Sequence, residues 1–183
     1  MIINSAIKRF KHYGISKTTM QEIATDADMS VGSLYLYFKN KEDIVLACAG
    51  KFAEHHLKIY KEILEEKISP QEKLKKYILN RFYANQETRN GSPHDKEITK
   101  MVIKVYPNRI EEESQWLFEN IFQILTEGIN LNQFKIADIS KEIQIFLYAI
   151  SYFFPLAINY IFKEPEKKDL IMIIEWFLEK WEK

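Results

Sequence analysis

The chain has a single cysteine, Cys48, among its 183 residues, so it can form no disulfide within itself. Such sparing use of cysteine is typical of proteins of the reducing cytosol. A signal peptide is lacking, and so is an apolar run of about 20 residues, the length that a membrane-spanning helix needs. The nearest candidate, residues 143–162, is interrupted by polar residues and a proline. We therefore expect a soluble, cytoplasmic protein with no membrane partner.

Net charge is also lacking, because 26 basic residues balance 26 acidic ones. A neutral chain does not have the global positive charge of a nonspecific nucleic-acid coat. Locally, however, the first 21 residues contain Lys8, Arg9, Lys11 and Lys17 and no acidic residue. Any binding to nucleic acid must therefore depend on individually placed contacts.

Motifs of known catalytic chemistry are absent as well. The sequence has no glycine-rich phosphate loop, no His or Cys cluster at metal-ligand spacing, and no nucleophile with an evident base. His55 and His56 are adjacent and would point about 100° apart on a helix, which makes a poor chelating pair. His94, Asp95 and Glu97 lie at an expected helix start, where the helix dipole favours acidic residues. We expect no enzyme activity, no metal site and no cofactor.

Hydrophobic residues make up 46% of the chain, which is enough for one or two compact domains. They recur at helical spacing almost throughout and predict an all-α fold of about nine helices with no sheet. Glycine and proline number only five each and mark the breaks. We expect Gly14 to end the first helix as a left-handed C′ residue, Pro107 to open a later helix, and Gly128 to end that helix. The long helices are expected at 41–67, 138–163 and 166–182.

Residues 18–43 carry the most information, because they predict two short helices around a tight turn and then a capped third helix. Apolar residues recur at i, i+3, i+4 and i+7 within 20–27 and again within 31–38, which gives each segment one buried face. Ser30 can cap the second of these helices. Thr18 or Thr19 can cap the first, since Gln or Glu follows each three residues later. Three helices within about 45 residues are typical of a helix-turn-helix.

Several residues favour DNA as the partner of this unit. Gly32 costs up to about 1 kcal/mol in a helix interior, but it removes a side chain where the backbone must approach another molecule closely. Tyr35 and Tyr37 carry hydroxyl groups that can reach phosphates, although the helical pattern also favours partial burial of the Tyr35 ring.

Lys41 is a further indication of DNA binding. It follows the expected cap Asn40 at the positive end of a new helix, where a cation is unfavourable by about 0.3–1 kcal/mol unless an anion is near. A phosphate held by the lysine and by the free N–H groups of the helix start would supply that anion. Glu42 and Asp43 could neutralise the lysine instead.

As a set, these residues resemble the N-terminal signature of the TetR family of bacterial transcriptional regulators. The resemblance is carried by Phe10, Gly14, Thr18, Thr19, Ile23, Ala24, Ala27, Ser30, Val31, Gly32, Leu34, Tyr35, Tyr37, Phe38, Asn40, Lys41, Glu42 and Ile44. It implies a ligand-responsive repressor that binds a palindromic double-stranded DNA operator as a homodimer. It also implies a helix-turn-helix DNA-binding domain at 1–45 and a helical effector-binding and dimerisation domain at 46–183.

The resemblance implies two kinds of DNA contact. Phosphates would be contacted by Thr18 or Thr19, Tyr35, Tyr37 and Lys41, and the major groove would be faced by Ser30, Val31, Gly32, Ser33 and Leu36. Position 31 is often basic in relatives and position 36 is often polar or aromatic. With valine and leucine there, few polar side chains remain to read base edges. We therefore expect readout by thymine methyl contacts and by DNA shape, on an A·T-rich operator.

The last two expected helices have apolar faces broader than one neighbouring helix can cover. An uncovered apolar patch usually marks an interface, and in the resembling family the last two helices of each chain form a four-helix dimer interface. The interface candidates are Tyr152, Phe153, Ile161, Met172, Trp176 and Phe177. Burial of these residues within one chain is the alternative.

The resemblance also implies a small, often apolar effector in the second domain, whose binding shifts the connecting helix. The candidate lining is aromatic: Tyr77, Phe82, Tyr106, Trp116, Phe118, Phe122, Tyr148 and Phe154. Aromatics at helical spacing also serve as plain core, so this alternative stays open. Two other functions remain in view. One is an effector-independent architectural or partner-controlled helix-turn-helix protein, and the other is a helical ligand-binding protein with weakened DNA binding.

Overall fold

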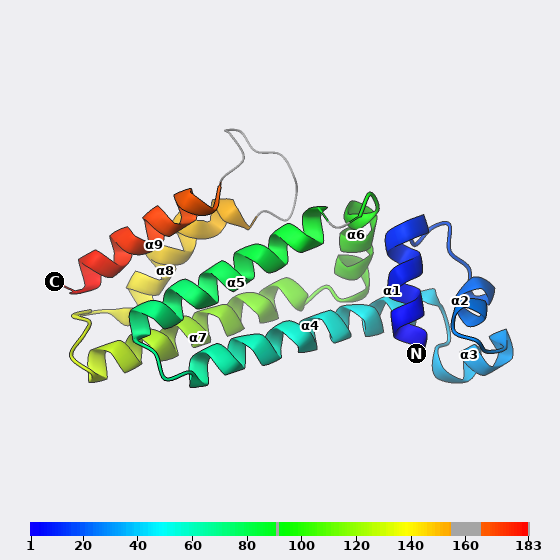
Figure 1. Cartoon of the computed structure of the whole chain (residues 1–183), viewed down its shortest axis with the longest axis horizontal. Coiled ribbons are helices and arrows are strands. Elements are labelled where there is room, and N and C mark those ends of the chain that lie inside the picture. Colours follow the sequence, from blue (N-terminus) through cyan, green and yellow to red (C-terminus); the bar gives the residue numbers. More distant parts are fainter. Residues whose placement is uncertain (91, 155–165, 183) are drawn as a thin grey trace. The chain divides into compact units, whose positions relative to one another are not determined.

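The structure is a computed structural model that describes residues 1–90, 92–154 and 166–182. Every regular element in these ranges is helical, which confirms the all-α prediction (Figure 1). The α-helices are α1 (Ile2–Tyr13), α2 (Met20–Asp26), α3 (Val31–Tyr37), α4 (Lys41–Glu65), α5 (Pro70–Asn90), α6 (Asp95–Val105), α7 (Arg109–Asn130), α8 (Ile139–Ile150) and α9 (Lys167–Glu182). A short 3₁₀ helix, η1 (Ser151–Phe153), follows α8.

The chain forms two compact units, which we describe separately. Unit 1 consists of residues 1–58 and 86–110, and unit 2 of residues 59–85 and 111–183. By packing, therefore, the N-terminal unit extends past residue 45 and takes in α6. The expected functional division at residue 45 stays a prediction.

Unit 1 packs α1, α2, α3, α6 and the first part of α4 around one apolar core. Its buried members are Ala6, Phe10, Ile15, Ile23, Ala24, Leu34, Ile44, Val45 and Val102. Val102 comes from α6, and Ile98, Met101 and Val105 of that helix pack against the same cluster. Burial of one face of α6 thus adds a later helix to the core formed by α1, α2, α3 and the first part of α4.

Gly14 ends α1 as expected, although its conformation is not the left-handed helical one. Its N–H donates to the Phe10 carbonyl oxygen at 3.0 Å, and its φ of 84° is positive while its ψ is 162°. A β-carbon there would lie 2.5 Å from the Glu97 Oε2 and 2.9 Å from the His94 Nδ1. The position therefore favours glycine for its backbone angle, and a β-carbon there would also require the ends of the Glu97 and His94 side chains to shift.

Unit 2 packs residues 59–65 of α4 and most of α5 and α7 with α8, η1 and α9. Tyr77, Phe146 and Trp181 are among its largest fully buried side chains. The core also contains polar pairs. The Lys73 Nζ lies 2.7 Å from a Glu127 carboxylate oxygen, and the Asn120 amide donates to the Tyr77 hydroxyl at 2.9 Å.

Local signals set most helix starts, and Ser69 shows how. Its hydroxyl accepts from the Glu72 N–H at 3.2 Å, while the Glu72 carboxylate accepts from the Ser69 N–H at 3.0 Å. This capping box holds the first turn of α5, where Pro70 needs no N–H partner.

Three predicted boundaries were wrong. Gly128 does not end α7, which continues to Asn130. The ring of Phe134 packs where a β-carbon of residue 128 would be. The glycine is thus required for packing. Pro107 lies in a turn, and α7 begins only at Arg109. The helix expected at 138–163 ends as an α-helix at Ile150, and its part from 155 lies outside the described residues.

None of the helices in the described ranges combines the length and the hydropathy needed to cross a bilayer.

Candidate nucleic-acid interface

Helices α2 and α3 are joined by the four-residue turn 27–30, and α3 has one face in the core and one in solvent. Leu34 is fully buried, whereas Tyr35, Leu36 and Tyr37 are 52%, 85% and 68% exposed. Asp28 takes a positive φ of 53° in the turn, a conformation that aspartate tolerates better than most residues. The predicted helix-turn-helix geometry is present, and its exposed face carries Tyr35, Leu36 and Tyr37, which we expected to contact DNA.

The cap of α3 uses the polar side chains at its start. The Ser30 hydroxyl accepts from the Ser33 N–H at 3.0 Å, which confirms Ser30 as the N-cap. The Ser30 and Ser33 hydroxyl oxygens also lie 2.8 Å apart and form a hydrogen bond with each other. Ser30 and Ser33, two of the residues predicted to face the major groove, are thus hydrogen-bonded to each other within the protein.

Gly32 is not required by the fold of α3. A β-carbon built there would meet only the Ser30 Oγ, at 3.8 Å, which is an ordinary contact. Its φ is not positive, so the backbone does not demand glycine either. The absence of a side chain at this exposed position has no internal cause, which favours the close approach of another molecule.

The two threonines before α2 have different roles. Thr19 is the N-cap: its hydroxyl accepts from the Glu22 N–H, and the Glu22 carboxylate accepts from the Thr19 N–H at 2.8 Å. Thr18 is only 2% exposed, and its hydroxyl donates to the Gly14 carbonyl oxygen at 2.7 Å. The prediction that either threonine could contact a phosphate needs correction, because burial removes Thr18 and leaves Thr19.

Lys41 is neutralised neither by Glu42 nor by Asp43. Its ammonium donates to the carbonyl oxygens of Ile15 at 2.6 Å and Thr18 at 2.8 Å. The side chain thus ties the first turn of α4 to the α1–α2 connection. An ammonium has three N–H donors, so one is left for a phosphate. The predicted phosphate contact stays a prediction, next to a structural role that the sequence did not show.

The expected cap Asn40 is confirmed, because its side-chain oxygen accepts from the Asp43 N–H at 2.8 Å.

Arg9 is a structural residue that sequence reasoning missed. Its guanidinium donates to both carboxylate oxygens of Asp26, at 2.6 and 3.1 Å, and lies 3.2 Å from the Glu22 carboxylate. Hydrogen bonding to Arg9 lowers the pKa of Asp26. The positive charge of Arg9 therefore fixes α1 to α2, while Lys8, Lys11 and Lys17 remain exposed.

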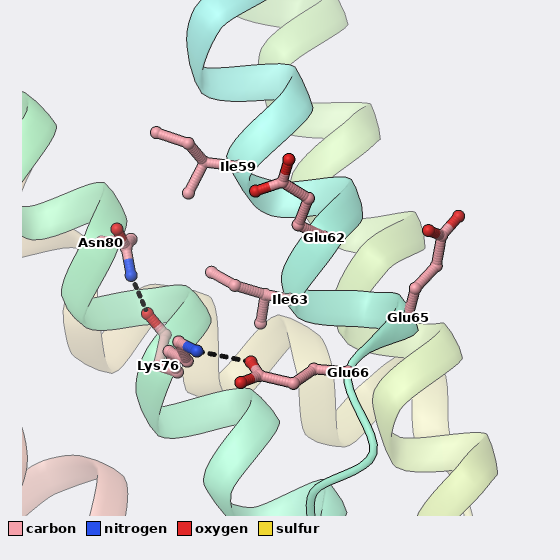
Figure 2. Close-up of a pocket in the computed structure, with 7 residues that line it drawn as sticks. All are labelled: Ile59, Glu62, Ile63, Glu65, Glu66, Lys76 and Asn80. Carbon is pink, nitrogen blue, oxygen red and sulfur yellow. Dashed lines mark hydrogen bonds and ion pairs between the residues drawn. The ribbon is translucent and has the colours of Figure 1, made fainter.

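The aromatic effector candidates are not gathered in one place. Tyr77 and Phe82 are buried in the unit 2 core, and Trp116, Phe118 and Phe154 pack against it. Phe122 and Tyr148 are exposed, and Tyr106 belongs to unit 1. A surface hollow of about 430 Å³ between α4 and α5 has none of them in its lining, which Figure 2 shows to be Ile59, Glu62, Ile63, Glu65, Glu66, Lys76 and Asn80.

The interface candidates divide into exposed and buried residues. Met172 and Trp176 are 64% and 59% exposed on α9, as an interface requires, and Tyr152 is partly exposed. Phe153 and Phe177 are corrections, because both are buried in the unit 2 core. Ile161 lies outside the described residues.

Two exposed apolar residues of α8, Ile145 and Tyr148, were not among the interface candidates. They are three residues apart and alternate with the buried Ile143, Phe146 and Ile150. This second apolar face was the signal in the sequence that could have found them.

Comparisons with known proteins agree with this geometry. Residues 2–48 match the model of the family described as bacterial regulatory proteins, tetR family. A transcriptional regulator from Cytophaga hutchinsonii has a crystal structure that superposes with a TM-score of 0.79 at 26% identity, covering 100% of this chain and 97% of that one.

Two Bacillus subtilis proteins are similar in sequence. The uncharacterized HTH-type transcriptional regulator YerO is 29% identical over 150 residues, which is 76% of this chain and 50% of YerO. The fatty acid metabolism regulator protein is 26% identical over 145 residues, covering 73% of this chain and 69% of that protein. The chain thus matches about half the length of the first relative and over two thirds of the second.

Proposed function

Since the chain belongs to the TetR family of bacterial regulatory proteins, we propose that it is a transcriptional repressor that binds a palindromic DNA operator as a homodimer. The observation that carries this proposal is the exposed face of α3. Tyr35, Leu36 and Tyr37 project into solvent from a helix whose other side is fixed in the core. A helix held in this way can enter the major groove with little loss of conformational entropy.

The phosphate contacts expected around α3 have support of their own. Tyr35 and Tyr37 are exposed, and Lys41 is held at the start of α4 with one N–H donor left for an anion. Lys8, Lys11 and Lys17 add exposed positive charge in the same unit. These contacts would set the register of α3 on the duplex, since phosphate contacts position a protein and base contacts specify the sequence.

The homodimer is supported by unit 2. Ile145 and Tyr148 of α8 and Met172 and Trp176 of α9 are large apolar side chains exposed on the two helices that the family uses for dimerisation. Large apolar residues exposed on a surface mark an interface, because their burial against a second copy is favourable. A dimer would also supply two copies of α3 for two operator half-sites.

We propose an effector with a carboxylate head and an apolar tail. Arg81 lies in unit 2 with its guanidinium carbon 5.7 Å from the centre of the Tyr60 ring, and Tyr77 is hydrogen-bonded to Asn120 close to that ring. Burial raises the pKa of Tyr60 to about 12, so its hydroxyl stays neutral beside the arginine. A guanidinium can pair with a carboxylate through charge-assisted hydrogen bonds, and one relative is named a fatty acid metabolism regulator.

Selection of fragments from the source genome tests the DNA-binding proposal. We expect the wild-type protein to enrich fragments that share an inverted repeat and to shift them in gels, and Tyr37→Ala to bind them more weakly. Ala is a good helix former and Tyr37 is exposed, so this variant should fold normally. Enrichment no greater than that of random genomic DNA would favour the helical ligand-binding alternative.

The effector proposal is tested on the selected fragment. Decanoate should release the protein from the fragment, while its methyl ester, which lacks the charge, should not. Arg81→Gln should bind the fragment normally and lose the response to decanoate. Release by neither compound would favour the effector-independent alternative.

A further inference from the structure

Leu36 is the most exposed side chain of α3, at 85%. Burial within the protein does not account for a leucine there, and its neighbours Tyr35 and Tyr37 are exposed as well. An exposed leucine offers a flexible apolar tip that a partner can bury. On the proposed function, that partner is the floor of the major groove.

The hydrogen-bonding capacity of α3 toward bases is small. Its sequence, VGSLYLY, contains no arginine, lysine, asparagine or glutamine, which are the side chains that pair in bidentate fashion with guanine or adenine. The hydroxyl of Ser33 is bonded to that of Ser30, and Ser30 also serves as the cap. Discrimination between bases by hydrogen bonds from α3 is therefore weak.

The surface beside Leu36 has a vacancy at Gly32. Residues four apart lie on the same helical face, and a helical side chain leans toward the turn before it, so Leu36 leans toward position 32. A β-carbon at residue 32 would meet only the Ser30 Oγ, at 3.8 Å. An exposed notch about the size of one methyl group thus lies next to an exposed leucine.

In the major groove, thymine alone presents a methyl group, at C5. We propose that Leu36 and the notch at Gly32 hold the C5 methyl of a thymine in each operator half-site, so that base discrimination rests on apolar contact. This inference rests on the proposed function and deepens it, because it assigns the base, the atom and the residues that read it.

Uracil in place of thymine tests the contact, since the two bases have the same hydrogen-bonding groups and differ only by the methyl. The selected operator is prepared with each thymine replaced in turn, symmetrically in both half-sites. We expect one symmetric replacement to weaken binding by wild-type protein about fifteenfold, or about fourfold for each methyl, from the free energy of burying one such group.

Two variants assign the contact to its residues. Leu36→Ala should bind the thymine operator at least as weakly as wild-type protein binds the uracil operator. It should no longer distinguish thymine from uracil at that position. Gly32→Ala fills the notch without strain and should bind the thymine operator more weakly than wild type while losing the preference over uracil. Leu131→Ala, a matched control at an exposed leucine of unit 2, should behave as wild type.

The outcomes separate this inference from the proposed function. Equal binding of thymine and uracil operators by wild-type protein overturns methyl reading and leaves the regulator intact. A preference for thymine that persists in Leu36→Ala overturns the assignment to Leu36. Failure of the wild-type protein to select any fragment overturns the proposed function, and methyl reading with it.

Discussion

At the scale of single residues, several side chains that we propose to contact DNA also make hydrogen bonds within the protein. Lys41 is the main example, because its ammonium bonds two carbonyl oxygens of the α1–α2 connection. Asn40 and Ser30 were predictable as caps since their partners lie three residues away. The partners of Lys41 lie 23 and 26 residues away, and no local pattern indicates them.

Replacement of Lys41 should therefore cost stability as well as DNA affinity. We expect Lys41→Met to lower the free energy of unfolding by about 1–3 kcal/mol, because two hydrogen bonds from a charged group are lost. Urea unfolding measures this effect, with Lys39→Met as the control at an exposed neighbour. Equal stability of the two variants would mean that Lys41 acts on DNA alone.

Gly14 and Gly50 provide a matched pair of glycine substitutions. Gly14→Ala should destabilise by about 1–3 kcal/mol, because alanine disfavours a φ of 84° and its β-carbon would press on Glu97 and His94. Gly50→Ala should stabilise by about 0.5–1 kcal/mol, because Gly50 lies within α4 with open space around it. Thermal unfolding of both variants should give shifts of opposite sign, and two shifts of the same sign would contradict this account.

At the scale of elements, α6 packs in unit 1 although it lies some 80 residues after α1. The Glu97 carboxylate accepts from the Ser16 N–H at 2.6 Å and from the Ser16 hydroxyl, and the Ser92 hydroxyl donates to the Lys11 carbonyl oxygen. The sequence predicted a helix start at His94, Asp95 and Glu97, where α6 begins. It could not show which core would bury that helix, since apolar periodicity identifies the buried face of a helix but not the element that packs against it.

The link between α6 and the α1–α2 connection should depend on pH. The hydrogen bond from the Ser16 hydroxyl lowers the pKa of Glu97 below its usual 4.5. A carboxyl with a lowered pKa contributes stability that is complete above pH 4.5 and is lost as pH falls through the folded-state pKa. We expect the urea midpoint of the wild type to fall over this range more steeply than that of Glu97→Gln. An equal fall of the urea midpoint with pH in the two proteins would show that Glu97 does not couple folding to pH.

At the scale of the whole molecule, the family and the all-α class were readable from the sequence, because the helix-turn-helix signature is local and nearly complete. The apolar residues of α8 and α9 were assigned less well. Phe177 and Trp176 are adjacent and both aromatic, yet one is buried and the other exposed. Composition alone does not tell which apolar face meets the core of its own chain.

The dimer proposal predicts that charge on this exposed face separates the subunits. Trp176→Glu and Met172→Glu should sediment as monomers and bind the operator more weakly, while retaining their helical circular dichroism because both side chains are exposed. Leu131→Glu, an exposed site on neither α8 nor α9, should remain dimeric. If the two α9 variants sedimented as dimers in the same way as the wild type, the dimer interface would lie elsewhere.

The central claim is that two copies of α3 read one operator, and a hydroxyl-radical footprint on the selected fragment tests it most directly. We predict protected segments related by two-fold symmetry, with half-site centres separated by about 34–36 Å, one turn of duplex, or by a multiple of that distance. The Tyr37→Ala variant should weaken both segments together. A single unsymmetric protected segment, or protection without regard to sequence along the fragment, would contradict the account.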